Sequence, residues 1–141
     1  MDDRRLERWS ADSGHRDVVR LDIPPDASRE RSFEIFVSLV VDNQLTRDDA
    51  MHGMRVLVDG ALEWARNVPT PSGGADSLEV RLRRSVPVGR PLRLVAMCEL
   101  HGVLRTSLGI VAEEEARSNV ATDSAAADSG ATDRAAMDRV K

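Results

Sequence analysis

Residues 50–65, AMHGMRVLVDGALEWA, carry apolar side chains at the spacing of an amphipathic helix, whereas the segments around them alternate. At about 100° per residue, one side of this helix is apolar: Met54, Leu57, Val58, Ala61, Trp64 and Ala65. The opposite side is polar: His52, Arg55, Asp59, Glu63 and Arg66. The stretch therefore predicts one long helix with a charged face.

Alternation of apolar and polar residues predicts strands on both sides of this helix. It occurs in four segments: residues 32–42, 76–86, 90–100 and 103–114. His101-Gly102 between the last two segments predicts a tight hairpin. A strand, a helix and then consecutive antiparallel strands predict an α+β fold in which the sheet covers the helix.

Length and composition predict a single domain with a charged surface. The chain has 141 residues, of which 41% are hydrophobic and 31% are charged. Residues 1–30 form a charged lead-in that we expect to be partly disordered, and residues 31–115 form the domain. The Ala/Asp/Ser-rich tail at residues 116–141 has few large apolar side chains, so we expect it to be mostly disordered.

Charge and cysteine content argue against several classes of function. With 20 Lys+Arg against 24 Asp+Glu and no concentrated basic segment, nucleic acid is not an expected partner. The amino terminus lacks the apolar centre of a signal peptide, and no membrane span is expected, so the sequence predicts a cytoplasmic protein. Cys98 is the single cysteine, which excludes an internal disulfide, and no residue spacing predicts a metal site.

Two motifs resemble the hotdog-fold acyl-CoA thioesterases, the group that includes 4-hydroxybenzoyl-CoA and phenylacetate-pathway thioesterases. They are HGM at residues 52–54, followed by Asp59 on the expected helix, and RSVPVGRPL at residues 84–92. The resemblance extends over residues 33–114. It implies a hotdog fold, in which an antiparallel sheet wraps around one central helix, and a homodimer or homotetramer.

The spacing of the first motif differs from the family pattern. That pattern is His-Gly-Gly, six residues and then Asp or Glu, whereas here Met54 replaces the second glycine and Ala61 occupies the position of the acid. Asp59 lies two residues before that position and Glu63 two residues after it. The resemblance therefore leaves two alternative carboxylates.

The resemblance implies hydrolysis of an acyl thioester. Such a reaction needs a carboxylate as base or nucleophile and hydrogen-bond donors for the oxyanion. Asp59 or Glu63 would supply the carboxylate, and His52 would orient or polarise the substrate. Gly53 and Met54 would place backbone N–H groups at the helix amino terminus, where the oxyanion would bind.

Arginines in the same segments are predicted to bind the substrate, because guanidinium groups match phosphate oxygens. The candidates are Arg55, Arg83, Arg84 and Arg90. Their ligand would be the thioester of coenzyme A or of an acyl carrier protein, with coenzyme A as part of the substrate and no other cofactor. The alternative is a non-catalytic hotdog-like acyl-binding or scaffold subunit, in which Arg55, Asp59 and Glu63 form structural ion pairs.

Overall fold

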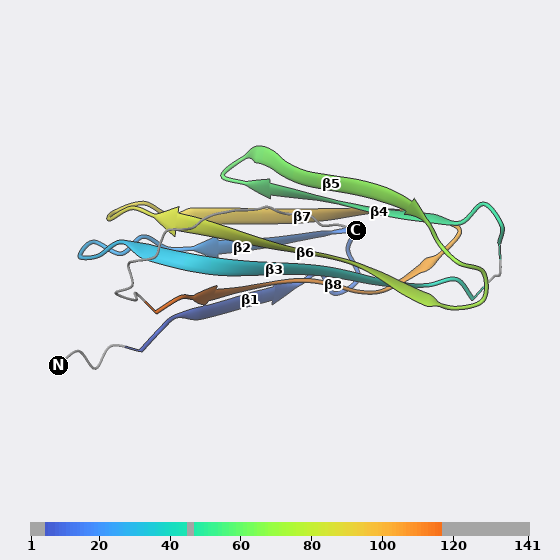
Figure 1. Cartoon of the computed structure of the whole chain (residues 1–141), viewed down its shortest axis with the longest axis horizontal. Coiled ribbons are helices and arrows are strands. Elements are labelled where there is room, and N and C mark those ends of the chain that lie inside the picture. Colours follow the sequence, from blue (N-terminus) through green and yellow to red (C-terminus); the bar gives the residue numbers. More distant parts are fainter. Residues whose placement is uncertain (1–4, 45–46, 117–141) are drawn as a thin grey trace.

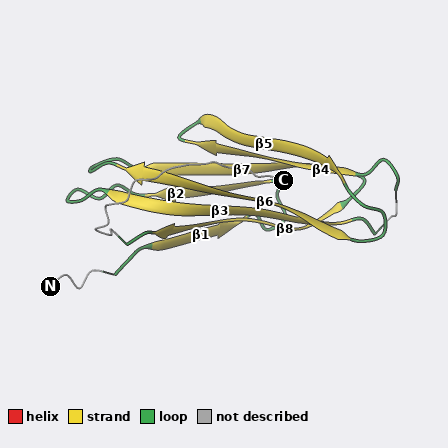
Figure 2. Ribbon diagram, viewed as in Figure 1, coloured by secondary structure: helices red, strands yellow, loops and turns green. Residues whose placement is uncertain are grey.

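The structure is a computed structural model that describes residues 5–44 and 47–116, and this part of the chain forms strands and no helix (Figure 1, Figure 2). The strands are β1 (Arg8–Asp12), β2 (Val18–Ile23), β3 (Arg31–Asp42), β4 (Met51–Val58), β5 (Ala61–Pro69), β6 (Ala75–Val86), β7 (Leu92–His101) and β8 (Leu104–Glu114). A search of the described residues for a helix that is long and apolar enough to cross a membrane finds none.

The strands form two antiparallel sheets packed face to face, as Figure 1 shows. One sheet has the order β1-β8-β3-β6 and the other has the order β2-β7-β4-β5. Among the described strands, β4 and β5 are the one consecutive pair that forms a hairpin, and every other connection crosses between the sheets. This order is that of an eight-stranded jelly roll.

The core lies between the two sheets and is built from alternate residues of each strand. β3 contributes a complete inner row whose members are fully buried: Phe33, Ile35, Val37, Leu39 and Val41. The facing sheet contributes further buried side chains, among them Val56, Leu94 and Ala96. Burial of these rows fixes the register of the strands, because a slip by one residue would turn every apolar side chain toward solvent.

The predicted central helix is absent, so the expected α+β hotdog fold is wrong. Residues 50–65 form β4, a turn and the first part of β5. Asp59 and Gly60 have φ angles of 51° and 86°, and positive φ at both central residues is typical of a type I′ hairpin turn. The inner residues of β4 alternate along the strand: His52, Met54, Val56 and Val58.

The hairpin predicted at His101-Gly102 is also wrong, although alternation located both of its strands. β7 and β8 belong to different sheets, so the chain crosses the sandwich at this point. Gly102 has a φ of 73° where the chain turns, and the buried Val103 closes this end of the core. A glycine turn between two alternating segments is compatible with a hairpin and with a crossing, so the local sequence does not distinguish them.

The charged lead-in contributes β1 and β2, one to each sheet. β1 pairs with β8, and β2 pairs with β7. The inner residues of β2 are buried in the core: Val19, Leu21 and Ile23. Residues 117–141 of the predicted tail lie outside the described residues.

Candidate functional site

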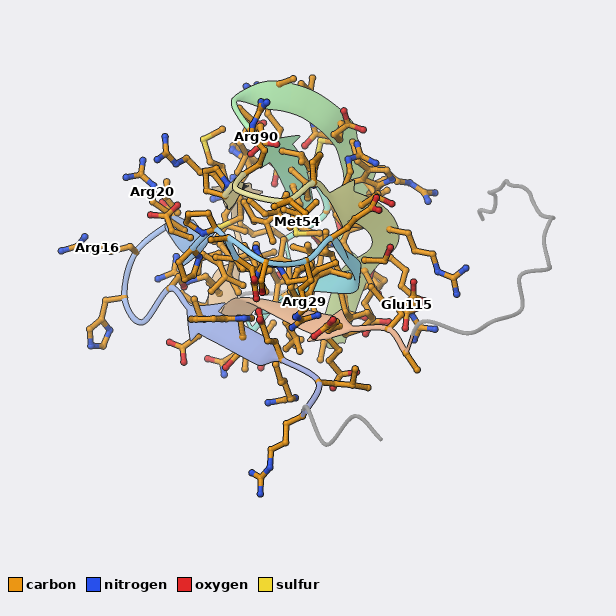
Figure 3. All side chains as sticks on the ribbon, turned by 90° about the vertical axis from the view of Figure 1, so that its left-hand side faces the viewer. Arg16, Arg20, Arg29, Met54, Arg90 and Glu115 are labelled. Atoms are coloured by element: carbon orange, nitrogen blue, oxygen red, sulfur yellow. The ribbon has the colours of Figure 1, made fainter. Side chains whose placement is uncertain are left out.

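A pocket of about 420 Å³ lies at the end of the sandwich where the β4–β5 turn meets the β6–β7 connection. Figure 3 looks onto this end of the molecule and labels Arg90 in that connection. The charged residues of its wall are Asp59, Arg84, Arg90 and Arg93. The apolar residues of its wall are Val86, Pro87, Pro91 and Leu92. The pocket therefore combines an excess of guanidinium groups with an apolar surface.

Backbone hydrogen bonds fix the β4–β5 turn against β7. The Asp59 N–H donates to the Arg93 carbonyl oxygen at 2.8 Å. In return, the Arg93 N–H donates to Oδ1 of Asp59 at 3.0 Å. One carboxylate oxygen of Asp59 is therefore engaged in holding the turn.

The β6–β7 connection forms the other wall, and it too is held by backbone contacts. Gly89 has a φ of 78°, and its N–H donates to the Asp26 carbonyl oxygen in the β2–β3 connection at 2.8 Å. The Arg90 N–H donates to the Pro87 carbonyl oxygen at 3.1 Å. Two backbone hydrogen bonds, one to the β2–β3 connection and one within the turn itself, therefore hold the turn that carries Arg90.

The three arginines of the pocket differ in their partners. Arg84 forms an ion pair with Glu63 of β5, across the gap between the two sheets. Arg93 forms an exposed ion pair with Asp22 at 3.3 Å. Arg90 has no side-chain hydrogen bond or ion pair with any residue in the described ranges, and it carries the unpaired positive charge of the pocket.

The structure brings together four of the residues singled out from the sequence. Asp59, Arg84 and Arg90 line the pocket, and Glu63 pairs with Arg84. Sequence reasoning missed Arg93. The sequence signal that could have located the β4–β5 turn is Asp59-Gly60, because an Asp-Gly pair between alternating apolar residues is a strong indicator of a hairpin.

His52 lies near the start of β4, away from the pocket, with its side chain fully buried. Its Nδ1 is 2.6 Å from Oγ1 of Thr70, and its Nε2 is 3.6 Å from Oδ2 of Asp76 on the opposite sheet. Burial lowers the pKa of His52, and the nearby Asp76 carboxylate opposes this shift in part. His52 therefore connects the sheets and does not lie beside Asp59 or Glu63.

Gly53 and Met54 lie within a strand, so they do not form the predicted helix amino terminus. Met54 belongs to the core, with 1% of its surface exposed. Gly53 lies on the outer face beneath the side chain of Asn67, where an added Cβ would be 1.6 Å from Oδ1 of Asn67. The helix amino terminus, on which the predicted oxyanion site at these two residues depended, is therefore not formed.

Arg55 and Arg83 point outward from the sheets into separate ion pairs. Arg55 pairs with Glu99 at 3.1 Å, and Arg83 pairs with Glu115 at 3.0 Å. The predicted pairing of Arg55 with Asp59 depended on helical spacing and is not formed. Both arginines are more than half exposed, so these ion pairs contribute little to stability.

Cys98 and the metal-binding side chains provide no further site in the described ranges. Cys98 lies in the core, and burial raises the pKa of its thiol, with the nearby Asp17 carboxylate acting in the same direction. A buried thiol with a raised pKa is a poor nucleophile. Within residues 5–44 and 47–116, no three His, Cys, Asp or Glu side chains gather closely enough to hold a metal ion.

Comparisons with known proteins find similarity to parts of solved structures. No model of a known protein family matches the chain, and no curated protein sequence matches it significantly. The crystal structure of dimeric latent PorU from Porphyromonas gingivalis is 15% identical with a TM-score of 0.48, and the match covers 77% of this chain and 12% of that one. An exo-beta-1,3-galactanase from Phanerochaete chrysosporium is 14% identical with a TM-score of 0.35, and the match covers 76% of this chain and 27% of that one. The chain thus spans about an eighth to a quarter of these proteins, and such similarity assigns it neither an activity nor a ligand.

Proposed function

We propose that this jelly-roll domain is a non-catalytic binding module that takes a small anionic ligand in the pocket between the β4–β5 turn and the β6–β7 connection. The observation that carries the proposal is the unpaired guanidinium of Arg90, which lies in the same pocket wall as Arg84. A guanidinium presents a planar fork of donors that fits a carboxylate or phosphate. An anion in the pocket would therefore meet a guanidinium group that has no side-chain partner among the described residues.

The rest of the pocket supports binding of a ligand with an apolar part next to its anionic group. Val86 and Leu92 are buried at the end of the core, and Pro87 and Pro91 have fixed φ angles. Because the hydrogen bonds of Gly89 and Arg90 already hold the connection, a ligand would order little additional backbone. A pre-organised wall lowers the entropic cost of binding.

Binding is better supported than hydrolysis because both candidate carboxylates are engaged. Asp59 accepts a backbone N–H, and Glu63 is paired with Arg84. Thioester hydrolysis, which the resemblance to hotdog thioesterases implies, stays a prediction. The helix amino terminus expected to supply its oxyanion donors is a strand in this structure. Coenzyme A remains a useful probe, because its phosphates belong to the proposed class of anionic groups.

The proposal is tested by titrating benzoate, inorganic phosphate and coenzyme A into the purified protein by isothermal calorimetry at physiological ionic strength. We expect a dissociation constant on the order of 1 mM for the best small anion, as is usual for a ligand of this size. Arg90→Ala should weaken this binding at least about tenfold, because a hydrogen bond to a charged group is lost. Arg90→Lys should keep part of the affinity, since it keeps the charge without the fork.

Arg16→Ala is the matched control. Arg16 lies in the β1–β2 connection with no side-chain partner among the described residues, and its loss changes the net charge equally. Equal loss of affinity in both alanine variants would reduce the effect to general electrostatics and contradict a site at Arg90. Hydrolysis of acetyl-CoA by the same protein would contradict a non-catalytic module and support the thioesterase prediction.

A further inference from the structure

Glu63 is an extra residue in the hairpin that forms one wall of the pocket. In the pairing of β4 with β5, Val56 lies opposite Trp64 and Leu57 lies opposite Leu62, so Glu63 has no partner on β4. Such a β-bulge changes the direction of a side chain and is common beside functional sites. Here the carboxylate of Glu63 meets the guanidinium of Arg84 on the other sheet.

Arg84 occupies an unusual position for an arginine. It lies on β6 in the inner row of side chains, two residues before the buried Val86, at the open edge of the sandwich. About a third of its side chain is exposed, and the same holds for Glu63. Arg84 belongs to the pocket wall, whereas Glu63 does not. The carboxylate that pairs with Arg84 therefore belongs to a residue outside the pocket wall, Glu63.

We infer that Glu63 is an internal competitor for the ligand, and that the ligand is a monocarboxylate with a short apolar body. This inference rests on the proposed function. The carboxylate of the ligand binds Arg84 and Arg90 from within the pocket, and Glu63 is released to solvent. Glu63 thereby reduces the affinity for the ligand until its own ion pair with Arg84 is broken.

Local charge favours a carboxylate over a phosphate. Arg84, Arg90 and Arg93 contribute three positive charges, and three carboxylates balance them: Glu63 on Arg84, Asp22 on Arg93, and Asp59 in the pocket wall. Exchange of the Glu63 carboxylate for one ligand carboxylate keeps this balance around the guanidinium groups. A phosphate brings a charge of about −1.5 to −2 at pH 7 and is repelled more strongly by Asp59.

The apolar wall determines the rest of the ligand. Pro87 and Pro91 belong to the turn that carries Arg90, and Val86 and Leu92 lie at the adjoining strand ends. These side chains offer no charged group to a ligand. Val86 and Leu92 are only 2% exposed. The surface that a short apolar body next to the carboxylate would remove from water is therefore that of the exposed Pro87 and Pro91, and its burial favours binding.

The test compares benzoate and inorganic phosphate as calorimetric probes of the wild type, Glu63→Gln and Glu99→Gln. Glu99→Gln is the matched control, because it removes a carboxylate–guanidinium ion pair from the outer face of the same sheet, away from the pocket. We expect Glu63→Gln to bind benzoate about two- to fivefold more tightly, because the partly exposed ion pair with Arg84 no longer has to be broken, and Glu99→Gln to match the wild type. Glu63→Asp, which keeps the charge on a shorter side chain, should fall between the wild type and Glu63→Gln.

The outcomes separate this inference from the proposed function. If benzoate binds the wild type and Glu63→Gln equally, and the affinity depends on Arg90, then Glu63 does not compete with the ligand. The proposed binding function is supported in that case. Tighter binding of phosphate than of benzoate overturns the carboxylate class. If neither the wild type nor Glu63→Gln binds benzoate, phosphate or coenzyme A, the proposed function itself fails. Circular dichroism of each variant confirms that the fold is retained.

Discussion

His52 is a titratable residue whose side chain has no contact with solvent. His52 is fully buried, with Thr70 and Asp76 as its polar neighbours. Its Nε2 lies 3.6 Å from Asp76 and has no hydrogen-bond partner among the described residues. A buried polar atom without a hydrogen bond costs stability, and a positive charge on the ring would cost more. The neutral ring is therefore the form that the fold favours.

The lowered pKa of His52 predicts that the protein loses stability under mildly acidic conditions. Burial lowers the pKa of His52 in the folded state. Well above the ordinary histidine value, His52 is neutral in both the folded and the unfolded protein, so its protonation does not affect the free energy of unfolding. As the pH falls below the ordinary histidine value of about 6.5, the unfolded state binds a proton that the folded state does not, and stability falls by up to about 1.4 kcal/mol per pH unit. Urea unfolding between pH 5 and pH 8 measures this slope.

Substitution at position 52 identifies the source of the slope. His52→Gln should flatten it, whatever the effect of the substitution on stability at pH 8. His15→Gln, in the exposed β1–β2 connection, should leave it unchanged. The assignment to His52 is wrong if His52→Gln retains the slope of the wild type.

At the scale of the element, two periodicities compete in residues 50–65. The apolar positions suit a helix, but those of residues 52–58 also alternate, and Val56 and Val58 are β-branched residues that favour strands. Gly60 would destabilise a helix interior by about 1 kcal/mol, whereas the Asp59-Gly60 pair suits the type I′ turn. The apolar stripe favours a helix, whereas the Asp59-Gly60 turn and the β-branched residues favour the hairpin that forms.

The crossing between β7 and β8 depends on the backbone of Gly102. Its φ of 73° is unfavourable for any residue with a Cβ, so Gly102→Ala should destabilise the protein by about 1 kcal/mol. Gly74→Ala is the control, because Gly74 has no such φ and an added Cβ meets no atom within 4 Å. Thermal unfolding of the two variants gives the comparison, and equal melting temperatures would contradict strain at Gly102.

At the scale of the whole molecule, an ion-pair clasp joins the first and last strands of the jelly roll. It consists of Glu7 before β1, Arg29 in the β2–β3 connection, Arg31 at the start of β3, and Glu114 at the end of β8. Arg31 is 3% exposed and Glu114 is 8% exposed. Hydrogen bonds from Arg29 hold the pKa of Glu114 below its usual range, although burial opposes the shift. The β2–β3 connection, which carries Arg29, lies at the same end of the sandwich as the β6–β7 connection, which carries Arg90 (Figure 1).

Removal of one charge from this clasp should destabilise the protein strongly. Glu114→Gln leaves the buried guanidinium groups with less compensation, and we expect a loss of about 2–3 kcal/mol in urea unfolding at pH 7. Glu113→Gln, which removes an exposed ion pair with Arg8 from the neighbouring position, should cost less than about 0.5 kcal/mol.

Acidification should also release the contribution of Glu114. Because its pKa is lowered in the folded state, this stability is present above the ordinary glutamate value and is lost as the pH falls through the folded value. The difference between Glu114→Gln and the wild type should therefore shrink below pH 4. A difference that stays constant down to pH 2 would show that the charge of Glu114 is not what stabilises the clasp.

The sequence alone locates four of the strands, because alternation is a local property that follows from the burial of one face. It located β3, β6, β7 and β8, and it singled out Asp59, Glu63, Arg84 and Arg90 as candidate residues. Which strands pair was decided by the tertiary structure, since a jelly roll joins segments far apart in the chain, such as β1 with β8. That long-range pairing places the β4–β5 turn beside the β6–β7 connection and so forms the pocket, for which no local pattern exists.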